Sequence, residues 1–511
     1  MAGNKIDSNL TGLAFAEETS LKVLPATPIW YGMEPNDYSD LGGKVSMVAR
    51  APIDPSRQNK KGTITDLDAS GGFNSDFTKS NLVRLLQGFL FADAREMAST
   101  APLNVAATVL TSAASIDKSY NAGAGLAVFA PSNLLLASGF TNAANNGLKK
   151  VVTAVAAKVT VVETVIDEAA PPATAKLVRV GHEFAAADVA LVVTSGIPSL
   201  SATAADFTLI GGLFAGNWIY IGGDVVGTRF VNNKGYARIA SVAAKTLTFD
   251  DTTFPPVTEA AAGISLRIFL GTAIRNESDP TLIKRRSYSV ERQLGIGDTP
   301  GAYQAEYLDG AVANEFTLNI PKADKLNADL SFVACDNKQV SGAPGDTIRA
   351  GIRIAALAEA AYNTSLDIVR IKMAILDPTT SNPTALFGFI DDAKLTISNS
   401  VTPNKAVGTL GSFDTTAGNF EVGGSVTAFF TSTAAVKAVR NNADVGLSVI
   451  GASKNAGFVF DVPLLGLGGG RVTVKKDEAI MIPLDTNGAQ SKFGNTLLFT
   501  SFAYLPTVAM P

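Results

Sequence analysis

The stretch TDLDASGGFNSD, residues 65–76, carries the clearest pattern for metal chemistry in the sequence. Its oxygen-bearing and small residues stand at the first, third, fifth and sixth positions of a calcium-binding EF-hand loop: Asp66, Asp68, Ser70 and Gly71. Such a loop also needs a bidentate Glu at its twelfth position, where this chain has Phe77. The residues before the loop, TITDL, alternate like a strand, whereas an EF-hand loop follows a helix. The pattern therefore predicts a tight glycine turn and no metal site.

Nucleophilic and metal chemistry is restricted by a single histidine and a single cysteine, His182 and Cys335. Ser–His–Asp and Cys–His sites need the histidine as base, and zinc sites usually need several such ligands. His182 stands beside a glycine and is predicted to be a turn residue. Cys335 is predicted to be a small buried residue at a strand end.

Sequence motifs for nucleotide and acyl chemistry are also missing: there is neither a GxxxxGK[ST] loop nor a GxSxG elbow. The glycine-rich run 295–301 lacks a third glycine in register and is predicted to be a loop. Composition leaves a two-carboxylate glycan hydrolase open, but no feature favours it. We therefore expect no enzyme, with no catalytic residues, no cofactor and no metal.

Composition indicates a protein that buries much of its surface against other proteins. Only 17% of the 511 residues are charged, against roughly 25% in typical soluble domains. No apolar run approaches the about 20 residues of a spanning helix, and residues 1–12 lack a signal-peptide core. The net charge of −4 provides no basic excess for stable binding of nucleic acid. We expect a protein made in the cytoplasm, with large protein contacts and no membrane partner.

Period-two alternation predicts a mainly β chain. The clearest expected strands are 45–52, 287–294, 315–321, 394–401, 425–432, 458–463 and 479–485. Helical spacing of leucines predicts one helix within 77–91. A second, shorter helix is expected within 432–443, where an asparagine at the end is typical of a left-handed cap.

Two pairs of segments resemble each other in the same order along the chain. Residues 44–87 resemble 394–440, since both begin with a Lys and an alternating strand, resume at Gly-Thr and run into a helix. Residues 307–334 resemble 460–487, since both read strand, small-residue loop, strand, lysine-aspartate turn and strand. Any two β-rich segments can agree by chance, but the shared order favours one β domain present twice. This alignment places Lys44 on Lys394, and Phe73 on Phe420.

The first copy is predicted to be interrupted by a long insertion. We expect the first domain in 1–95 and 284–340, an inserted β-rich region in 96–283 and the second domain in 341–511. The inserted region is rich in Ala, Val and Thr, and its part 205–272 has the short strands and tight turns of a compact barrel. Because insertions are tolerated at surface loops, it should project away from the main assembly.

Several blocks, in this order, resemble the tail tube proteins of long, non-contractile phage tails of the siphovirus type. They are 12–43, 59–93, 217–224, 287–294, 309–321 and 425–432. The resemblance implies duplicated β-sandwich or barrel domains with a flanking helix each, plus the inserted small β domain. It also implies a structural virion protein whose rings stack into the tube through which DNA is ejected.

Its implied partners are further copies of itself, the tape measure protein, the tail terminator and tip proteins, and double-stranded DNA in passage without specific binding. Two domains per chain would let three chains close a pseudo-sixfold ring; the alternative is a homohexamer. A different class of function, a decoration or host-adhesion protein with the insert as binder, stays open. The expected localisation is the tail of the virion.

The polar stretch 54–63 has two interpretations, a solvated hairpin or a loop that reaches the next ring. In the second, its cations would meet carboxylates of the neighbouring ring; the candidate inter-ring residues are Arg57, Lys60, Lys61, Asp66 and Asp68, with Asp76 as a further acid. Each exposed pair contributes only about 0.2–1 kcal/mol, so many copies would have to act together. The N-terminal arm, 1–20, is expected to order on assembly.

Overall fold

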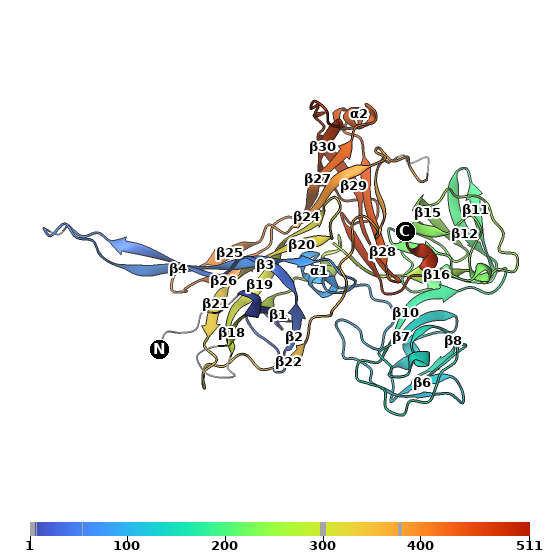
Figure 1. Ribbon diagram of the computed structural model, residues 1–511, viewed down its shortest axis with the longest axis horizontal. Coiled ribbons are helices and arrows are strands. Elements are labelled where there is room, and N and C mark those ends of the chain that lie inside the picture. Colours follow the sequence, from blue (N-terminus) through green and yellow to red (C-terminus); the bar gives the residue numbers. More distant parts are fainter. Residues whose placement is uncertain (1–5, 7, 54, 297–302, 377–380) are drawn as a thin grey trace.

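The computed structural model describes residues 6, 8–53, 55–296, 303–376 and 381–511, and it is mainly β (Figure 1). The described part contains two α-helices, α1 (Val83–Phe89) and α2 (Ala434–Arg440). Both lie within the predicted ranges, although α1 is half as long as its leucine pattern suggests. Asn442, just after α2, has φ 46°, which confirms the predicted left-handed asparagine.

Two β-sandwiches form the body of the molecule. We call them sandwich 1 and sandwich 2. The strands of sandwich 1 are β1 (Gly12–Glu17), β2 (Ile29–Met33), β3 (Pro35–Arg50), β4 (Lys60–Asp76), β18 (Tyr288–Ile296), β19 (Tyr303–Ile320), β20 (Asn327–Ala334), β21 (Asp336–Val340) and β22 (Ile352–Ile354). The strands of sandwich 2 are β23 (Ile368–Ile375), β24 (Ile390–Ser398), β25 (Thr402–Lys405), β26 (Ser412–Thr416), β27 (Glu421–Phe429), β28 (Val445–Ser453), β29 (Ala456–Gly469), β30 (Met481–Gly488) and β31 (Leu498–Phe502). All seven strands expected from alternation are present.

The same pairing order occurs in both sandwiches. One sheet of sandwich 1 runs β3-β4-β20-β19, and one sheet of sandwich 2 runs β24-β27-β30-β29. The other sheets contain β1-β18-β19-β21 and β23-β28-β29-β31. In each sandwich one long strand, β19 or β29, takes part in both sheets, and a helix follows the second strand of the hairpin. This order supports a duplication.

The two first-named sheets are joined edge to edge within the chain. Strand β19 pairs with β24 over six residue pairs, from Glu315 opposite Ser398 to Ile320 opposite Ala393. Eight strands therefore form one sheet, β3-β4-β20-β19-β24-β27-β30-β29. The cores also merge, since the Phe77 ring packs against Phe458, 4.9 Å between centroids.

The predicted glycine turn in 65–76 is wrong, because these residues lie inside strand β4. They pair with β3 on one edge and, from Ala69 onward, with β20 on the other. Gly71 has φ 138° at a bulge, and a Cβ there would lie 2.2 Å from the Cα of Leu41. Gly424 in β27 has φ 142° and an equally close contact with the carbonyl of Lys394. The glycines serve a close approach of paired strands, which bends the hairpin without ending the strand.

Gly71 and Gly424 also show which residues of the two sandwiches correspond to each other. Lys44 lies opposite Asp68 in one hairpin and Ser398 lies opposite Glu421 in the other, in each case three residues before the glycine. Lys44 thus corresponds to Ser398, and the sequence alignment of Lys44 with Lys394 was out of register. By the same measure Phe73 corresponds to Val426, not to Phe420.

A twelve-stranded sheet is built from the residues between α1 and β18. Its strands are β5 (Leu110–Ala114), β6 (Ser119–Ala122), β7 (Asn133–Ser138), β8 (Gly147–Val155), β9 (Lys158–Val161), β10 (Lys176–Glu183), β11 (Val189–Thr194), β12 (Ile197–Ala202), β13 (Trp218–Ile221), β14 (Gly235–Val242), β15 (Thr246–Thr252) and β16 (Arg267–Leu270). It encloses two separate cores, one between Leu110 and Leu177 and one mainly between Phe184 and Leu270. We call the residues between α1 and β18 the insert.

The insert packs on sandwich 2, beside β28 (Figure 1). Strand β17 (Thr272–Arg275), which follows β16 directly, pairs with β31 over four residues. Aromatic side chains of the insert, among them Trp218 and Tyr236, share a core with Val459 and Phe502 of sandwich 2. The sequence did not predict this contact, and the expectation that the insert projects away from the main assembly stays a prediction.

The chain leaves and rejoins sandwich 1 at one place. Ala92 and Ile283 form an isolated antiparallel bridge, and the N–H of Lys284 donates to the carbonyl of Phe91 at 2.7 Å. The two ends of the insertion are therefore adjacent, as an insertion into a connecting loop requires.

Candidate assembly surfaces

Two open strand edges lie at opposite ends of the eight-stranded sheet. In the described residues β3 pairs only with β4, and the end of β29 pairs with β30 but has no partner on its other side beyond Leu465. In sandwich 1 the corresponding part of β19 has β20 on one side and β24 on the other. Unpaired edges present N–H and C=O groups that can pair with another chain.

One face of the eight-stranded sheet is polar along its whole width. Its side chains alternate with buried core residues: Asp37, Ser39, Asn74, Asp76, Glu315, Thr317, Asn319, Asn327, Asp329, Lys394, Thr396, Ser425, Thr427, Asp485 and Asn487. Amides and carboxylates bond across strands, for example from Asn74 to Asp329 at 2.6 Å and from Asn319 to Asp329 at 2.8 Å. Five of these residues are acidic and one is basic, so the face is negative.

The β3–β4 hairpin continues far beyond the sheet as a two-stranded arm (Figure 1). Residues 44–50 of β3 pair only with β4, and at about 3.3 Å per residue they extend roughly 23 Å. Apolar side chains on the arm are exposed, including Met47 at 58% and Ile64 at 54%. Contiguous exposed apolar groups of this kind are typical of surfaces that contact another protein.

The predicted inter-ring residues are distributed over this arm. Arg57 stands in the loop at its tip, and Lys60 and Lys61 begin β4; all three are exposed. Asp66 and Asp68 lie nearer the body, where both carboxylates bond the ammonium of Lys405 from β25. The hydrogen bond from Lys405 also lowers the pKa of Asp66. The structure thus separates the five residues, with the cations at the tip and the acids paired within the chain.

The carboxylates of Asp66 and Asp68, which the calcium pattern would use as ligands, face the ammonium of Lys405 instead. Across the described ranges, no group of three or more His, Cys, Asp or Glu side chains could hold an ion. Lys405 supplies the positive charge that the calcium hypothesis assigned to an ion. Its place opposite the acids in space could not be read from the sequence, since hundreds of residues separate them.

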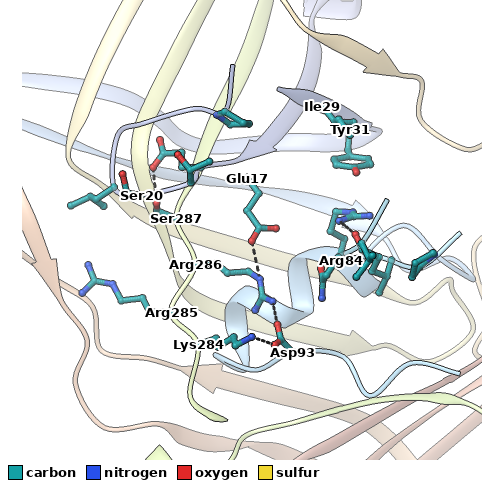
Figure 2. A pocket seen from close by; sticks show the side chains of 18 of the residues that line it. Glu17, Ser20, Ile29, Tyr31, Arg84, Asp93, Lys284, Arg285, Arg286 and Ser287 are labelled. Atoms are coloured by element: carbon teal, nitrogen blue, oxygen red, sulfur yellow. Dashed lines mark hydrogen bonds and ion pairs between the residues drawn. The ribbon is translucent and has the colours of Figure 1, made fainter. Parts of the chain in front are cut away.

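A groove of about 1130 Å³ lies where the insertion joins sandwich 1 (Figure 2). Arg286 donates to Glu17 at 3.1 Å, to the carbonyl of Ala92 at 3.0 Å and to Asp93, which Lys284 also contacts. Burial raises the pKa of Asp93, but the hydrogen bonds from Lys284 and Arg286 outweigh it and lower the pKa. These contacts join the two ends of the insertion, at Asp93 and at Lys284, to each other and to Glu17 of β1.

The sequence has one cysteine and one histidine, and both are part of the β-structure. Cys335 is buried between β20 and β21, as predicted for a strand end, and burial raises the pKa of its thiol to about 11. His182 lies inside β10, paired on both sides, so the predicted turn is wrong. The neighbouring Gly181 is needed for close strand approach, because a Cβ there would lie 2.3 Å from the carbonyl of Ile268. The loop predicted at 295–301 begins within β18 and otherwise falls outside the described residues.

A buried aspartate stands at the same place in each sandwich. Asp309 lies opposite the first residue of β21, and Asp461 lies opposite the first residue of β31. Arg349 of sandwich 1 makes two hydrogen bonds to Asp309, at 2.5 and 2.6 Å. Arg238 of the insert makes two to Asp461, both at 3.2 Å. Sequence reasoning missed both pairs, whose only sequence signal is an acid inside a mainly apolar run, YLDGAVA in β19 and FVFDVPLL in β29.

The chain has open sheet edges, a projecting arm and ion pairs whose partners both lie within the chain. These features are typical of a structural β-sandwich protein that assembles with further chains. A sequence model of the phage tail tube protein family matches residues 8–488, nearly the whole chain. The chain therefore belongs to the phage tail tube protein family and is a component of the virion tail. No curated protein matches it.

Neither of the helices in the described residues has the length or apolar character to cross a bilayer.

Proposed function

We propose that this chain polymerises into stacked rings that form the tube of a long, non-contractile tail, through which DNA is ejected. The observation that carries this proposal is the pairing of β19 with β24 inside one chain. The same two kinds of edge are open at β29 and β3. Pairing β29 of one chain with β3 of the next would repeat the internal junction, and a head-to-tail contact of this kind closes into a ring.

Each chain would contribute two sandwiches to the ring. Three chains then supply six similar sandwiches, related by pseudo-sixfold symmetry, and this is the stoichiometry that we favour. A ring of six chains is the alternative. The repeated strand order supports the first, because one junction inside each chain and one between chains would be alike.

The polar face of the eight-stranded sheet would line the lumen. The opposite face is buried in the shared core, so the polar face is the one left for water and DNA. Its excess of carboxylates would repel phosphates, which suits a conduit that must release DNA. DNA would pass without specific binding.

The arm would connect stacked rings. It extends beyond the sheet and exposes apolar side chains that a neighbouring ring could cover, while Arg57, Lys60 and Lys61 would meet acids of that ring. The short β25–β26 hairpin of sandwich 2 carries Lys405, which holds Asp66 and Asp68 in place at the base of the arm.

The insert would stand outside the tube wall, since it packs on the other sheet of sandwich 2, β23-β28-β29-β31. We propose residues 1–95 and 284–340 as the first tube domain, 96–283 as the inserted region and 341–511 as the second, with the last boundary moved past Ile354 because β22 pairs with β2 of sandwich 1. Within the insert, the core around the compact barrel 205–272 begins earlier, at Phe184. The role proposed for all three parts is structural.

The tube would be made in the host cytoplasm. A tape measure protein inside the lumen and terminator and tip proteins at its ends are the partners that such a tube requires.

A pair of cysteines can test the edge pairing at a defined register. Gly468 pairs with Asp485, which on its other side faces Ser425, the residue after Gly424. In sandwich 1, Glu315 pairs with Ser331, which faces Gly72, the residue after Gly71. Gly468 thus corresponds to Glu315, as Lys44 corresponds to Ser398. Since Glu315 faces Ser398 inside the chain, Gly468 should face Lys44 of the next chain.

The experiment combines Lys44→Cys with Gly468→Cys, oxidises assembled tubes and separates the products in SDS without reductant. We expect closed covalent trimers; covalent hexamers would support the alternative ring. The matched control, Glu315→Cys with Ser398→Cys, should form its disulfide within one chain. Tubes of the first variant that give no crosslink, while the control oxidises, would contradict the edge pairing.

The arm is tested by Lys60→Glu combined with Lys61→Glu. Reversal of these charges should shorten the tubes or reduce their yield in electron micrographs, while rings still form. Lys454→Glu, at an exposed lysine in the turn between β28 and β29, serves as control. Tube length and yield equal to the wild type would count against the role of the arm. Chains that remain monomeric under all conditions would favour the alternative function, a decoration or host-adhesion protein.

A further inference from the structure

Between the two cores of the insert lies a cavity of about 330 Å³ that holds an uncompensated positive charge. Arg179 from β10 lines it and is only 8% exposed. Its Nε is buried without a hydrogen-bond partner, and no contact in the described residues gives its guanidinium a carboxylate. A buried charge without a partner costs several kcal/mol, so native proteins seldom keep one without a reason.

A second unpaired nitrogen faces the same cavity. His182 also lines it, and the Nδ1 of its ring is buried without a partner. Arg179 and His182 are three residues apart and would normally point to opposite faces of β10. The pairing of β10 with β7 shifts register between Arg179 and Gly181, and this bulge turns both side chains to one side.

The remaining walls are mixed. Asn133 is buried, and its side-chain oxygen accepts from the N–H of Ala130, which leaves its amide N–H₂ for a ligand. Asp206 lines the cavity but accepts hydrogen bonds from Thr208 and not from Arg179. Apolar contact surface comes from Pro131 and Leu209.

We propose that this cavity binds a small ligand with a single carboxylate, of the class of acidic sugars. The planar guanidinium of Arg179 can hold a carboxylate through two parallel hydrogen bonds. The amide of Asn133 and the ring of His182 would bond hydroxyl groups, and Pro131 and Leu209 would cover an apolar sugar face. The volume lies in the range of small-molecule sites, which often occur where two modules meet.

Charge balance favours a monoanion over a dianion such as phosphate. Burial lowers the pKa of His182 to about 4, so at neutral pH its ring carries no charge. The cavity then offers one positive charge, from Arg179, and one negative charge at its rim, from Asp206. A second negative charge on the ligand would have no partner.

The test is a calorimetric titration of the full chain with D-glucuronate and N-acetylneuraminate, with D-glucose as neutral probe and inorganic phosphate as dianion. We expect at least one of the two acids to bind at least tenfold more tightly than glucose or phosphate. Arg179→Met should weaken that binding at least tenfold, whereas Arg440→Met, on the surface of α2, should not change it.

A second variant keeps the proposal falsifiable if Arg179→Met fails to fold. Asn133→Asp retains the acceptor for Ala130 but adds a carboxylate to the cavity that Arg179 lines, so it should also weaken binding at least tenfold without lowering the melting temperature. The proposal is overturned if neither acid binds, if phosphate binds more tightly than both, or if the folded variants bind as the wild type does.

Discussion

Asp309 and Asp461 occupy corresponding buried positions in the two sandwiches, yet different parts of the chain neutralise them. Sandwich 1 uses Arg349 from its own sequence, with Lys338 a further 3.7 Å contact. Sandwich 2 receives Arg238 from the insert, which also bonds Asp250 at 2.8 Å. The insert belongs to sandwich 1 in sequence but completes the charge balance of sandwich 2.

The pKa directions differ accordingly. Burial raises the pKa of Asp309, but the hydrogen bonds and charge of Arg349 outweigh it, so the pKa is lowered. For Asp461, which has no exposed side-chain surface, burial dominates over the attraction of Arg238 and the pKa is raised. The comparison teaches that the two sandwiches share the position of a buried acid and differ in the part of the chain that supplies its arginine.

The substitution with the largest expected effect on this difference between the sandwiches is Arg238→Met. It leaves Asp461 and Asp250 without their shared cation in a buried site, and loss of one partner of such a pair costs about 3–5 kcal/mol. We expect a lower melting temperature and faster protease cleavage at the two connections of the insert to sandwich 1, because the contact that holds the insert on sandwich 2 is weakened. Arg229→Met, at an arginine that bonds only backbone carbonyls of the insert, is the control. Equal melting temperatures for both variants would contradict a linking role for Arg238.

Arg349→Met should have a smaller effect. Asp309 keeps the hydroxyl of Ser289 at 2.8 Å and the ammonium of Lys338, so the loss should be about 1–3 kcal/mol. Denaturant unfolding of both arginine variants measures the difference. A loss as large as that of Arg238→Met would mean that the two aspartates depend equally on their arginines.

The smallest expected effect is in the pH dependence. Asp309, and likewise Glu291 with its partner Arg353, have pKa values below their ordinary ones. A depressed carboxyl pKa stabilises the fold above the unfolded value, 3.8 for Asp, and that stability is lost as pH falls through the folded value.

The free energy of unfolding of the wild type should therefore fall more steeply below pH 4 than that of Arg349→Met. The two curves should converge in acid, because protonated Asp309 no longer needs its arginine. Parallel curves down to pH 2 would show that Arg349 acts through packing alone.

Local sequence patterns predicted most elements of the two sandwiches. Strands with one buried face alternate clearly, and α2 ended at its asparagine as expected. The pattern at 65–76 misled because Gly71 and Gly72 are typical of turns, and only the long-range partners β3 and β20 make the segment a strand. The register of the duplication depended on those same glycines, which a comparison of Lys and Phe positions could not reveal.

The candidate surfaces were less accessible to sequence reasoning. Residues 55–61 lie at the tip of a hairpin, in agreement with one of the two interpretations of the stretch 54–63. The pairing of Asp66 and Asp68 with Lys405 depends on how the two sandwiches meet. The cavity at Arg179 depends on a bulge in β10, which no residue pattern announces. Contacts between distant parts of the chain carry most of what the sequence did not show.

The adjacent ends of the insertion have a practical consequence for engineering. Since Ala92 and Ile283 already touch, a folded cargo domain whose own termini lie close together could replace the insert without straining sandwich 1. The exchange would have to keep β17, whose pairing covers β31, and would have to supply a cation for Asp461. Each tube would then display the cargo at regular intervals along its outer wall, at a density set by the ring repeat.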